Sequence, residues 1–165
     1  MVVISDTGPL LYLFLIGHLD ILPTMFGRVI LPRAVLEIEL SDESTARGLR
    51  KFLENLPEWL SIYEEPLNAH PEVASLGRGE RNAISLMLEL NGDLLLCDDS
   101  AARKRAIRLG VEVMGTLGLI DEAGFRGLID FESAIERLVG GTSFHPSVAL
   151  IEEVRERHRQ RKELK

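Results

Sequence analysis

Short apolar runs alternate along this chain with longer segments that carry apolar residues at helical spacing. The runs rich in Val, Ile and Leu, which predict strands, cover residues 1–5, 28–31, 59–63, 94–97 and 111–114. Successive strands joined through helices run parallel, and a parallel sheet needs helices on both of its faces. The pattern therefore predicts a three-layer α/β/α fold around a central parallel sheet, with 59–63 as a short edge strand.

Helical segments are expected between and after these strands, bounded by Gly, Pro and the pair Asn91-Gly92. Pro32 is expected to open the third of them, and 64–76 to form a loop. The predicted helices span 9–16, 19–26, 32–40, 45–56, 80–90, 100–109, 117–124, 131–138 and 147–161. At 165 residues the chain is expected to be a single domain, with a core of about 1–124 and a C-terminal helical extension of about 125–165.

The single cysteine, Cys97, cannot form an internal disulfide and favours a reducing compartment. The longest apolar run, 9–16, is too short to span a bilayer, and no basic segment precedes the first strand. The sequence therefore predicts a cytoplasmic protein with no membrane partner. The four histidines show no metal-binding spacing and are interpreted as surface or capping residues.

Acidic residues follow the predicted strands at the point where each strand ends. Asp6 comes directly after the first strand, and Asp98 and Asp99 come after the fourth. The carboxyl ends of parallel strands are the usual place for a functional site. The net charge of −7 argues against direct binding of phosphates, unless the acids gather to hold Mg²⁺ or Mn²⁺.

Two helices add further carboxylates. Glu80 lies in the first turn of its helix, where favourable interaction with the helix dipole is a sufficient alternative explanation. Glu37 and Glu39 are two residues apart and cannot share a helix face, so at most one of them is expected to point into a site. Arg81 and Arg103 lie nearest to these acids and are the basic residues expected to hold a substrate backbone.

Blocks of this sequence, taken in order, resemble the PIN-domain family. They are VISDTGPL (3–10), LPRAV (31–35) followed by Glu39-Leu40, LGRGERNAI (76–84), LCDD (96–99) followed by Ala102-Arg103 and Leu109-Gly110, and GTLG (115–118). The first block is similar to the bacterial and archaeal PIN-like subfamily that begins with Ser-Asp-Thr followed by Pro-Leu. The resemblance covers most of residues 1–124.

The resemblance implies acids that converge on one or two divalent ions, Mg²⁺ or Mn²⁺. Carried over residue by residue, the catalytic metal ligands are Asp6, Glu39, Glu80 and Asp98, with Asp99 as a further ligand and Thr7 and Thr116 as supporting hydroxyls. For Thr7, capping of the helix that begins near Pro9 is an equal alternative. The family places its second acid six residues after the proline, where this chain has Ile38; Glu39 is one residue late, and Glu37, one residue early, is the alternative.

A metal-dependent ribonuclease of the toxin type is the function that the resemblance implies, with RNA as substrate, an antitoxin protein as partner and a homodimer as the assembly. The alternative is a catalytically weak or inactive PIN-like protein that binds RNA or a protein partner. A phosphotransfer or phosphatase domain fits less well, because Asp6 has no adjacent acid and Gly8 stands where an Asp-x-Asp motif needs its second aspartate.

Overall fold

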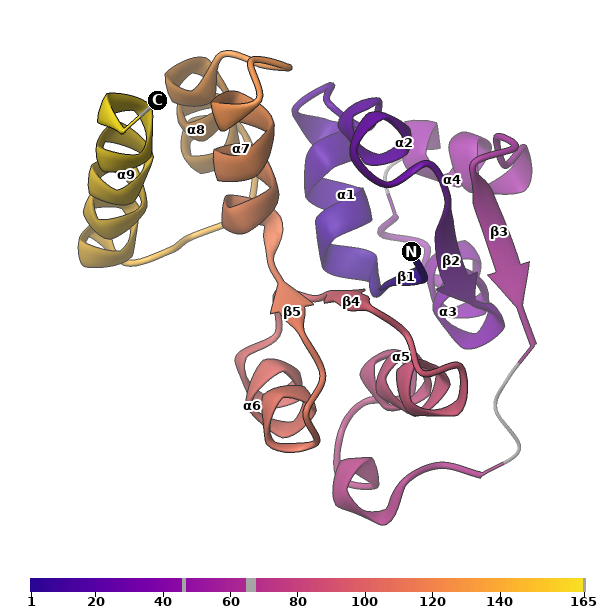
Figure 1. Ribbon diagram of the computed structural model, residues 1–165. Coiled ribbons are helices and arrows are strands. Elements are labelled where there is room, and N and C mark those ends of the chain that lie inside the picture. Colours follow the sequence, from indigo (N-terminus) through magenta and orange to yellow (C-terminus); the bar gives the residue numbers. More distant parts are fainter. Residues whose placement is uncertain (46, 65–67, 165) are drawn as a thin grey trace.

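The sheet of the computed structural model, which describes residues 1–45, 47–64 and 68–164, has five parallel strands in the order β3-β2-β1-β4-β5 (Figure 1). Their bounds are β1 (Val3–Ser5), β2 (Val29–Pro32), β3 (Leu60–Tyr63), β4 (Leu94–Leu96) and β5 (Val113–Met114). Strand β1 lies in the middle, and Ile4 pairs with both Ile30 and Leu95. The predicted three-layer parallel fold is confirmed, and β3 is an edge strand as expected.

Helices cover both faces of the sheet (Figure 1). They are α1 (Thr7–Leu15), α2 (Ile21–Phe26), α3 (Arg33–Ser41), α4 (Arg47–Glu54), α5 (Arg78–Glu89), α6 (Ser100–Arg108), α7 (Thr116–Phe125), α8 (Phe131–Gly141) and α9 (Val148–Glu163), with a 3₁₀ turn at Pro71–Val73. Neighbouring strand residues point to opposite faces. In β4, Leu95 accordingly packs in the apolar cluster with α5 and α6, whereas Leu96 joins the cluster that includes α1 and α2.

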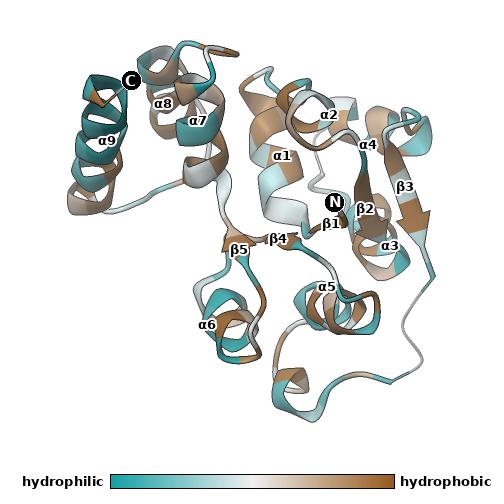
Figure 2. Cartoon of the chain, in the orientation of Figure 1, coloured by the Kyte–Doolittle hydropathy of each residue, from teal (hydrophilic) through white to brown (hydrophobic). Residues whose placement is uncertain are grey.

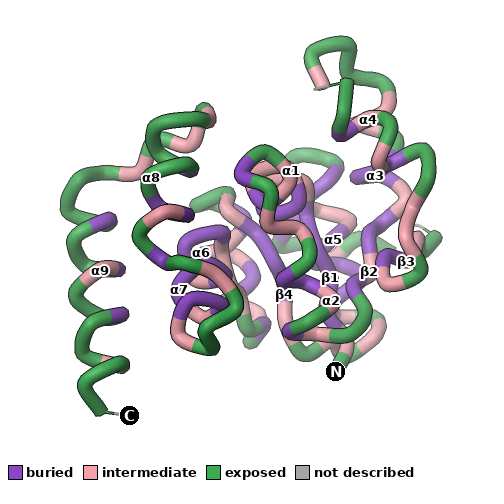
Figure 3. The backbone as a smooth tube through the Cα atoms, turned by 90° about the horizontal axis from the view of Figure 1, so that it is seen from above, coloured by how far each residue is buried: buried purple, intermediate pink, exposed green. Residues whose placement is uncertain are grey.

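The C-terminal helices pack against the same apolar cluster as α1 and α2. Ile135 of α8 and Ile151 and Val154 of α9 are buried members of that cluster. Helix α9 is otherwise mostly hydrophilic, and its buried positions lie on one side of the helix (Figures 2 and 3). Within the described ranges no helix is both long and apolar enough to cross a membrane.

The structure differs from the sequence-based expectations at a few boundaries. Pro32 is the last residue of β2, because its backbone is extended (ψ 141°), and α3 begins one residue later. Cys97 follows β4 instead of ending it. The predicted loop 64–76 contains the 3₁₀ turn at Pro71–Val73, where His70 accepts a hydrogen bond from the Glu72 N–H. Residues 46 and 65–67 of the predicted helix and loop lie outside the described residues.

Candidate active site

The site lies where the order of the strands changes direction. From β1 the chain proceeds outward through β2 to β3, then returns through α5 to β4, on the other side of β1. Crevices at such a switch point, at the carboxyl ends of the strands, are where open α/β sheets bind ligands. The Asp6 N–H donates to the Leu96 carbonyl (2.9 Å), which ties the ends of β1 and β4 together. Asp6 and Asp98 therefore leave the sheet side by side.

Asp6 is a buried carboxyl group among other acids. Its exposed fraction is only 7%, and burial raises its pKa from the ordinary 3.8 to about 7. The negative charges of Glu80, Asp98 and Asp99 raise this pKa further, whereas a hydrogen bond from the Thr7 backbone N–H lowers it. It occupies the N-cap position of α1 without forming a side-chain cap bond within the described chain. Because its oxygens are not used in capping and lie close to three other acids, Asp6 is electrostatically prepared to receive a cation.

Asp98 is held by Thr116, the first residue of α7. The Thr116 N–H donates to Oδ1 (2.7 Å) and its hydroxyl donates to Oδ2 (2.6 Å). Burial raises the pKa of Asp98, while these two donors and Arg103 lower it. Two glycines lie against the same carboxylate: a Cβ on Gly8 would lie 2.9 Å from Oδ2, and one on Gly115 would lie 2.8 Å from Oδ1. The orientation of Asp98 is therefore fixed.

Glu80 and Asp99 lie at the edge of this cluster, close enough for their charges to raise the pKa of Asp6. Glu80 is the third residue of α5, and its carboxylate folds back over Gly77, the N-cap residue. Asp99 is exposed and caps α6, because its Oδ1 accepts from the Ala102 N–H (2.8 Å). The structure thus brings together Asp6, Glu80, Asp98 and Asp99, which come from segments far apart in the sequence.

The two acids of α3 are not brought to this cluster. Glu37 is exposed and pairs with Arg78 (2.9 Å), and Glu39 accepts from the Thr45 hydroxyl (3.3 Å). Two apolar residues of α3 lie near Asp6 instead: a Cβ placed on Gly79 would lie 3.3 Å from Asp6 Oδ1, 3.6 Å from Val35 Cγ2 and 3.7 Å from Ile38 Cδ1. The role of Glu39, or of its alternative Glu37, as a metal ligand stays a prediction.

The remaining predicted site residues lie near the acids. Arg103 donates from Nη1 to the Cys97 carbonyl (2.9 Å), just before Asp98. Arg81 is half-buried on α5, next to Glu80. Thr7 is the first residue of α1, with Asp6 as its N-cap, so the alternative that Thr7 caps this helix is wrong. Burial and the charge of Asp6 raise the pKa of the buried Cys97 thiol to about 12, which disfavours a thiolate nucleophile.

The donor set suits a divalent ion that keeps part of its water shell. Within the described ranges, no three acidic, His or Cys side chains form a ready-made ion cage. Mg²⁺ usually takes one or two carboxylates, several waters and a substrate phosphate, so a closed cage is not required. Asp6 and Asp98 could supply hard oxygen ligands, and a cation would relieve the repulsion that adds to burial in raising the pKa of Asp6.

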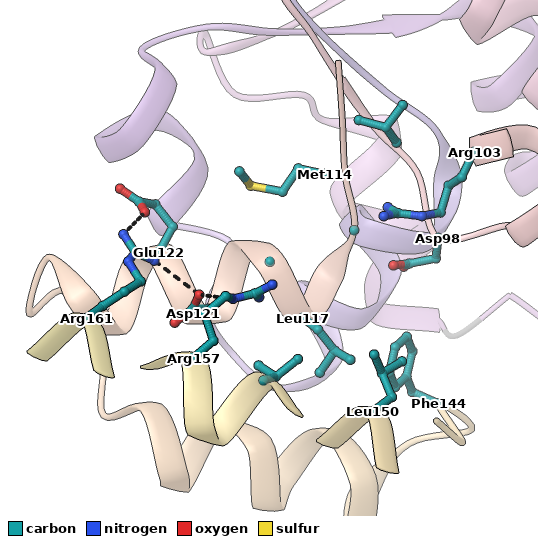
Figure 4. Close-up of a pocket in the computed structure, with 14 residues that line it drawn as sticks. Asp98, Arg103, Met114, Leu117, Asp121, Glu122, Phe144, Leu150, Arg157 and Arg161 are labelled. Atoms are coloured by element: carbon teal, nitrogen blue, oxygen red, sulfur yellow. Dashed lines mark hydrogen bonds and ion pairs between the residues drawn. The ribbon is translucent and has the colours of Figure 1, made fainter. Parts of the chain in front are cut away.

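A pocket of about 570 Å³ opens beside Asp98, between α7, α9 and the segment that joins α8 to α9 (Figure 4). Asp98 and Arg103 lie at one end. At the other end, Arg157 and Arg161 of α9 reach Asp121 and Glu122 of α7. Met114 and Leu117 lie between the two ends, and Phe144 and Leu150 line the pocket on the side of Asp98 (Figure 4).

One buried polar cluster at this pocket was not expected from the sequence. His158 is buried, stacks on Phe131 (3.9 Å between ring centroids, 6° between planes) and places Nδ1 2.7 Å from Asp121 Oδ1. Its interpretation as a surface or capping histidine is therefore wrong. The spacing of Ile151, Val154 and His158 marks one buried helix face and was the available signal.

Comparison with known proteins agrees with this architecture. A family model described as PIN domain matches residues 2–160. Among solved structures, a PilT N-terminus domain protein from the hyperthermophilic archaeon Sulfolobus solfataricus P2 matches with a TM-score of 0.50 and 15% identity, over 88% of this chain and 100% of that chain. A search of curated proteins finds no match. Because this match covers nearly the whole chain, the chain belongs to the PIN-domain family, whose members are generally nucleases.

Proposed function

We propose that the protein is a metal-dependent endoribonuclease that hydrolyses RNA phosphodiester bonds, and that it acts in the cytoplasm as a toxin-type PIN protein. The observation that carries the proposal is the buried Asp6, whose pKa is raised to about 7 at the end of β1, beside Glu80 and Asp98. Perturbed acids gathered at a strand switch point are typical of catalytic sites.

Each residue of the cluster has a distinct part in this proposal. Asp6, Glu80 and Asp98 would hold Mg²⁺ or Mn²⁺, with Asp99 able to contribute through water. When bound, such an ion supplies positive charge to the phosphate and lowers the pKa of water at the site. Thr116 orients Asp98 through its two hydrogen bonds. Arg103, next to Asp98, is placed to bind a phosphate oxygen, and Arg81 is the second candidate.

The net charge of −7 is consistent with this assignment only if the cation mediates contact with RNA. A strongly acidic chain repels phosphates, and few of its arginines lie near the acids. The divalent ion therefore serves both for chemistry and for binding, and RNA affinity should be lost together with cleavage when a chelator is added.

The direct test is cleavage of labelled single-stranded and structured RNA in Mg²⁺, Mn²⁺ or chelator. Wild type is expected to cleave only with metal, and Asp6→Asn to lose at least 100-fold in rate. Asp20→Asn, which changes the exposed aspartate that precedes α2 as its N-cap residue, is the matched control and should keep wild-type activity. Equal cleavage by wild type and Asp6→Asn would point to a contaminating nuclease and contradict the proposal.

Thermal unfolding gives an independent readout, because an ion that binds only the folded state must stabilise it. Mn²⁺ is expected to raise the melting temperature of wild type and of Asp20→Asn, but not that of Asp6→Asn.

The toxin assignment predicts that expression of wild type, but not of Asp6→Asn, arrests growth, and that an antitoxin partner relieves the arrest. Light scattering would test the homodimer.

A catalytically weak PIN protein that binds RNA or a partner is the second candidate. The observation that favours it is that the side of α3 near Gly79 and Asp6 is formed by the apolar residues Val35 and Ile38, while Glu37 and Glu39 make contacts elsewhere. Metal-dependent RNA binding with no cleavage above that of Asp6→Asn would support this candidate over the nuclease.

A further inference from the structure

The pocket beside Asp98 has the size of a ligand site. Its volume of about 570 Å³ lies within the range of roughly 300–1,000 Å³ that is typical of small-molecule pockets. It is continuous with the acid cluster, because Asp98 and Arg103 form one of its ends (Figure 4). An RNA strand with one of its phosphates at Asp98 would therefore place part of a neighbouring nucleotide at the mouth of this pocket.

The charges around the pocket do not favour a phosphate inside it. Its described lining carries three acids and three arginines, so the formal charges cancel. The arginines at the far end are already engaged, Arg157 with Asp121 (3.1 Å) and Arg161 with Asp121 (3.1 Å) and Glu122 (2.6 Å). The walls between the two charged ends are apolar (Figure 4). A neutral, flat group with polar edges suits this lining better than an anion.

Phe144 provides a fixed aromatic ring on the wall. Tyr12 of α1 packs against it edge-to-face, with ring centroids 5.0 Å apart and planes at 79°. The Phe144 N–H donates to the Thr142 hydroxyl (3.1 Å), which holds the backbone of the loop. At the other end, Asp121 holds the planar guanidinium of Arg157. Aromatic rings and guanidinium planes are the surfaces on which unpaired bases stack.

We propose that this pocket is a nucleobase subsite, which takes the base of a nucleotide next to the phosphate bound at Asp98. The inference rests on the proposed function and adds the class of substrate. A base inside a duplex cannot enter such a pocket, so the bound nucleotide must be unpaired and turned out of the strand. The substrate is accordingly single-stranded RNA, or a loop or bulge.

The test compares binding of three dye-labelled 12-nucleotide probes by fluorescence anisotropy in Ca²⁺: a mixed-sequence RNA strand, the same strand without bases, and the strand annealed to its complement. Gel analysis afterwards verifies that the probes are intact. Wild type is expected to bind the base-bearing strand about 10-fold more tightly than the abasic strand and the duplex. Equal affinity for all three probes would overturn the proposal.

Variants localise this preference to the pocket. Leu150→Trp fills the pocket from its rim, where Leu150 is 41% exposed, and Phe144→Leu removes the ring but keeps apolar bulk. Both are expected to reduce the 10-fold ratio to about 2-fold or less. Val148→Trp is the matched control, since Val148 is exposed on the same helix and does not line the pocket, and it should keep the wild-type ratio.

The outcomes separate this proposal from the nuclease assignment. If both pocket variants keep the wild-type ratio, the subsite is refuted, even when wild type cleaves RNA in Mn²⁺. If the ratio falls in both variants but not in Val148→Trp, the subsite is supported, even when no cleavage is detected. Circular dichroism of each variant verifies that it is folded, and Phe144→Leu decides the question if Leu150→Trp does not fold.

Discussion

Asp6 and Asp98 leave neighbouring strands at the same edge of the sheet but differ in the hydrogen bonds that their carboxylates receive. Asp6 is buried and is repelled by the neighbouring acids, and these two effects raise its pKa to about 7. Burial raises the pKa of Asp98 as well, but this carboxylate also receives two hydrogen bonds from Thr116, which oppose the shift. At neutral pH one carboxyl group is thus close to half-protonated without metal, while its neighbour is oriented by donors. A difference of this kind can be tested one side chain at a time.

The raised pKa of Asp6 predicts a pH-dependent loss of stability in chelator. Below about pH 4 the group is protonated in both the folded and the unfolded chain and contributes nothing. Between pH 4 and 7 only the unfolded chain releases the proton, so stability falls as pH rises, by on the order of 4 kcal/mol in all, and stays lower above pH 7. Asp6→Asn should therefore be more stable than wild type at pH 8, with the difference vanishing near pH 4. Urea unfolding at both pH values measures this, and a difference independent of pH would contradict it.

Removal of the Thr116 hydroxyl should lower the affinity of the site for a cation bound by Asp98. Thr116→Val deletes the 2.6 Å hydrogen bond and leaves that of the backbone N–H. Loss of a partner that orients a metal ligand typically costs 10–100-fold in metal affinity or activity, and we expect a change in that range for Mn²⁺ affinity. Thr116→Ser, which keeps the donor, should restore most of it. Calorimetric titration measures the affinity, and equal losses in Val and Ser would assign Thr116 a packing role only.

The elements themselves were largely predictable, because each depends on a local apolar pattern. The five strands, the edge position of β3 and the acids after β1 and β4 all follow from periodicity and from the rule for strand ends. The rotation of α3 about its axis was not predictable, since it is set by packing against Gly79 of α5. The burial of His158 was missed because its partner, Asp121, lies 37 residues away.

That rotation places Ile38, together with Val35, on the side of α3 that packs near Asp6, so an acid at position 38 is a candidate to complete the cluster. Ile38→Glu should increase Mn²⁺ affinity and cleavage by several-fold, because the carboxylate would enter beside Asp6. Glu37→Gln and Glu39→Gln separate the alternatives: both should stay within about 2-fold of wild type if the two side chains keep their contacts with Arg78 and Thr45. A large loss in Glu39→Gln would instead identify Glu39 as the missing ligand, reached after a shift of α3.

At the scale of the whole molecule, α9 closes the wall of the pocket and is held there by a buried polar cluster. Asp121 of α7 pairs with Arg157, His158 and Arg161 of α9. The Arg161 guanidinium also lies 4.1 Å from the centroid of the Phe125 ring. The apolar contacts of Ile151 and Val154 support the same docking. The position of the pocket wall therefore depends on Asp121, a carboxylate at the opposite end of the pocket from Asp98.

Asp121→Asn should detach this wall. The change keeps the shape of the side chain but removes the charge that pairs with the partly exposed Arg157 and Arg161 and alters the hydrogen bond to the buried His158, which we expect to cost about 1–3 kcal/mol. Glu122→Gln, at a more exposed pair, should cost less than about 1 kcal/mol. Urea unfolding gives both values, and limited proteolysis should cut α9 sooner in Asp121→Asn alone. Equal stability of the two variants would show that apolar packing holds α9 without Asp121.

The glycines on either side of Asp98 make the protein easy to inactivate by substitutions that alter no chemical group of the site. An alanine at Gly8 or Gly115 would place a methyl group within 3 Å of a carboxylate oxygen, and the side chain would have to turn away from Thr116. If the activity harms its host, a genetic selection for survivors should recover both glycine positions about as often as the acids, although neither carries a charge or a proton. Lists of essential residues drawn from catalytic chemistry alone would miss them.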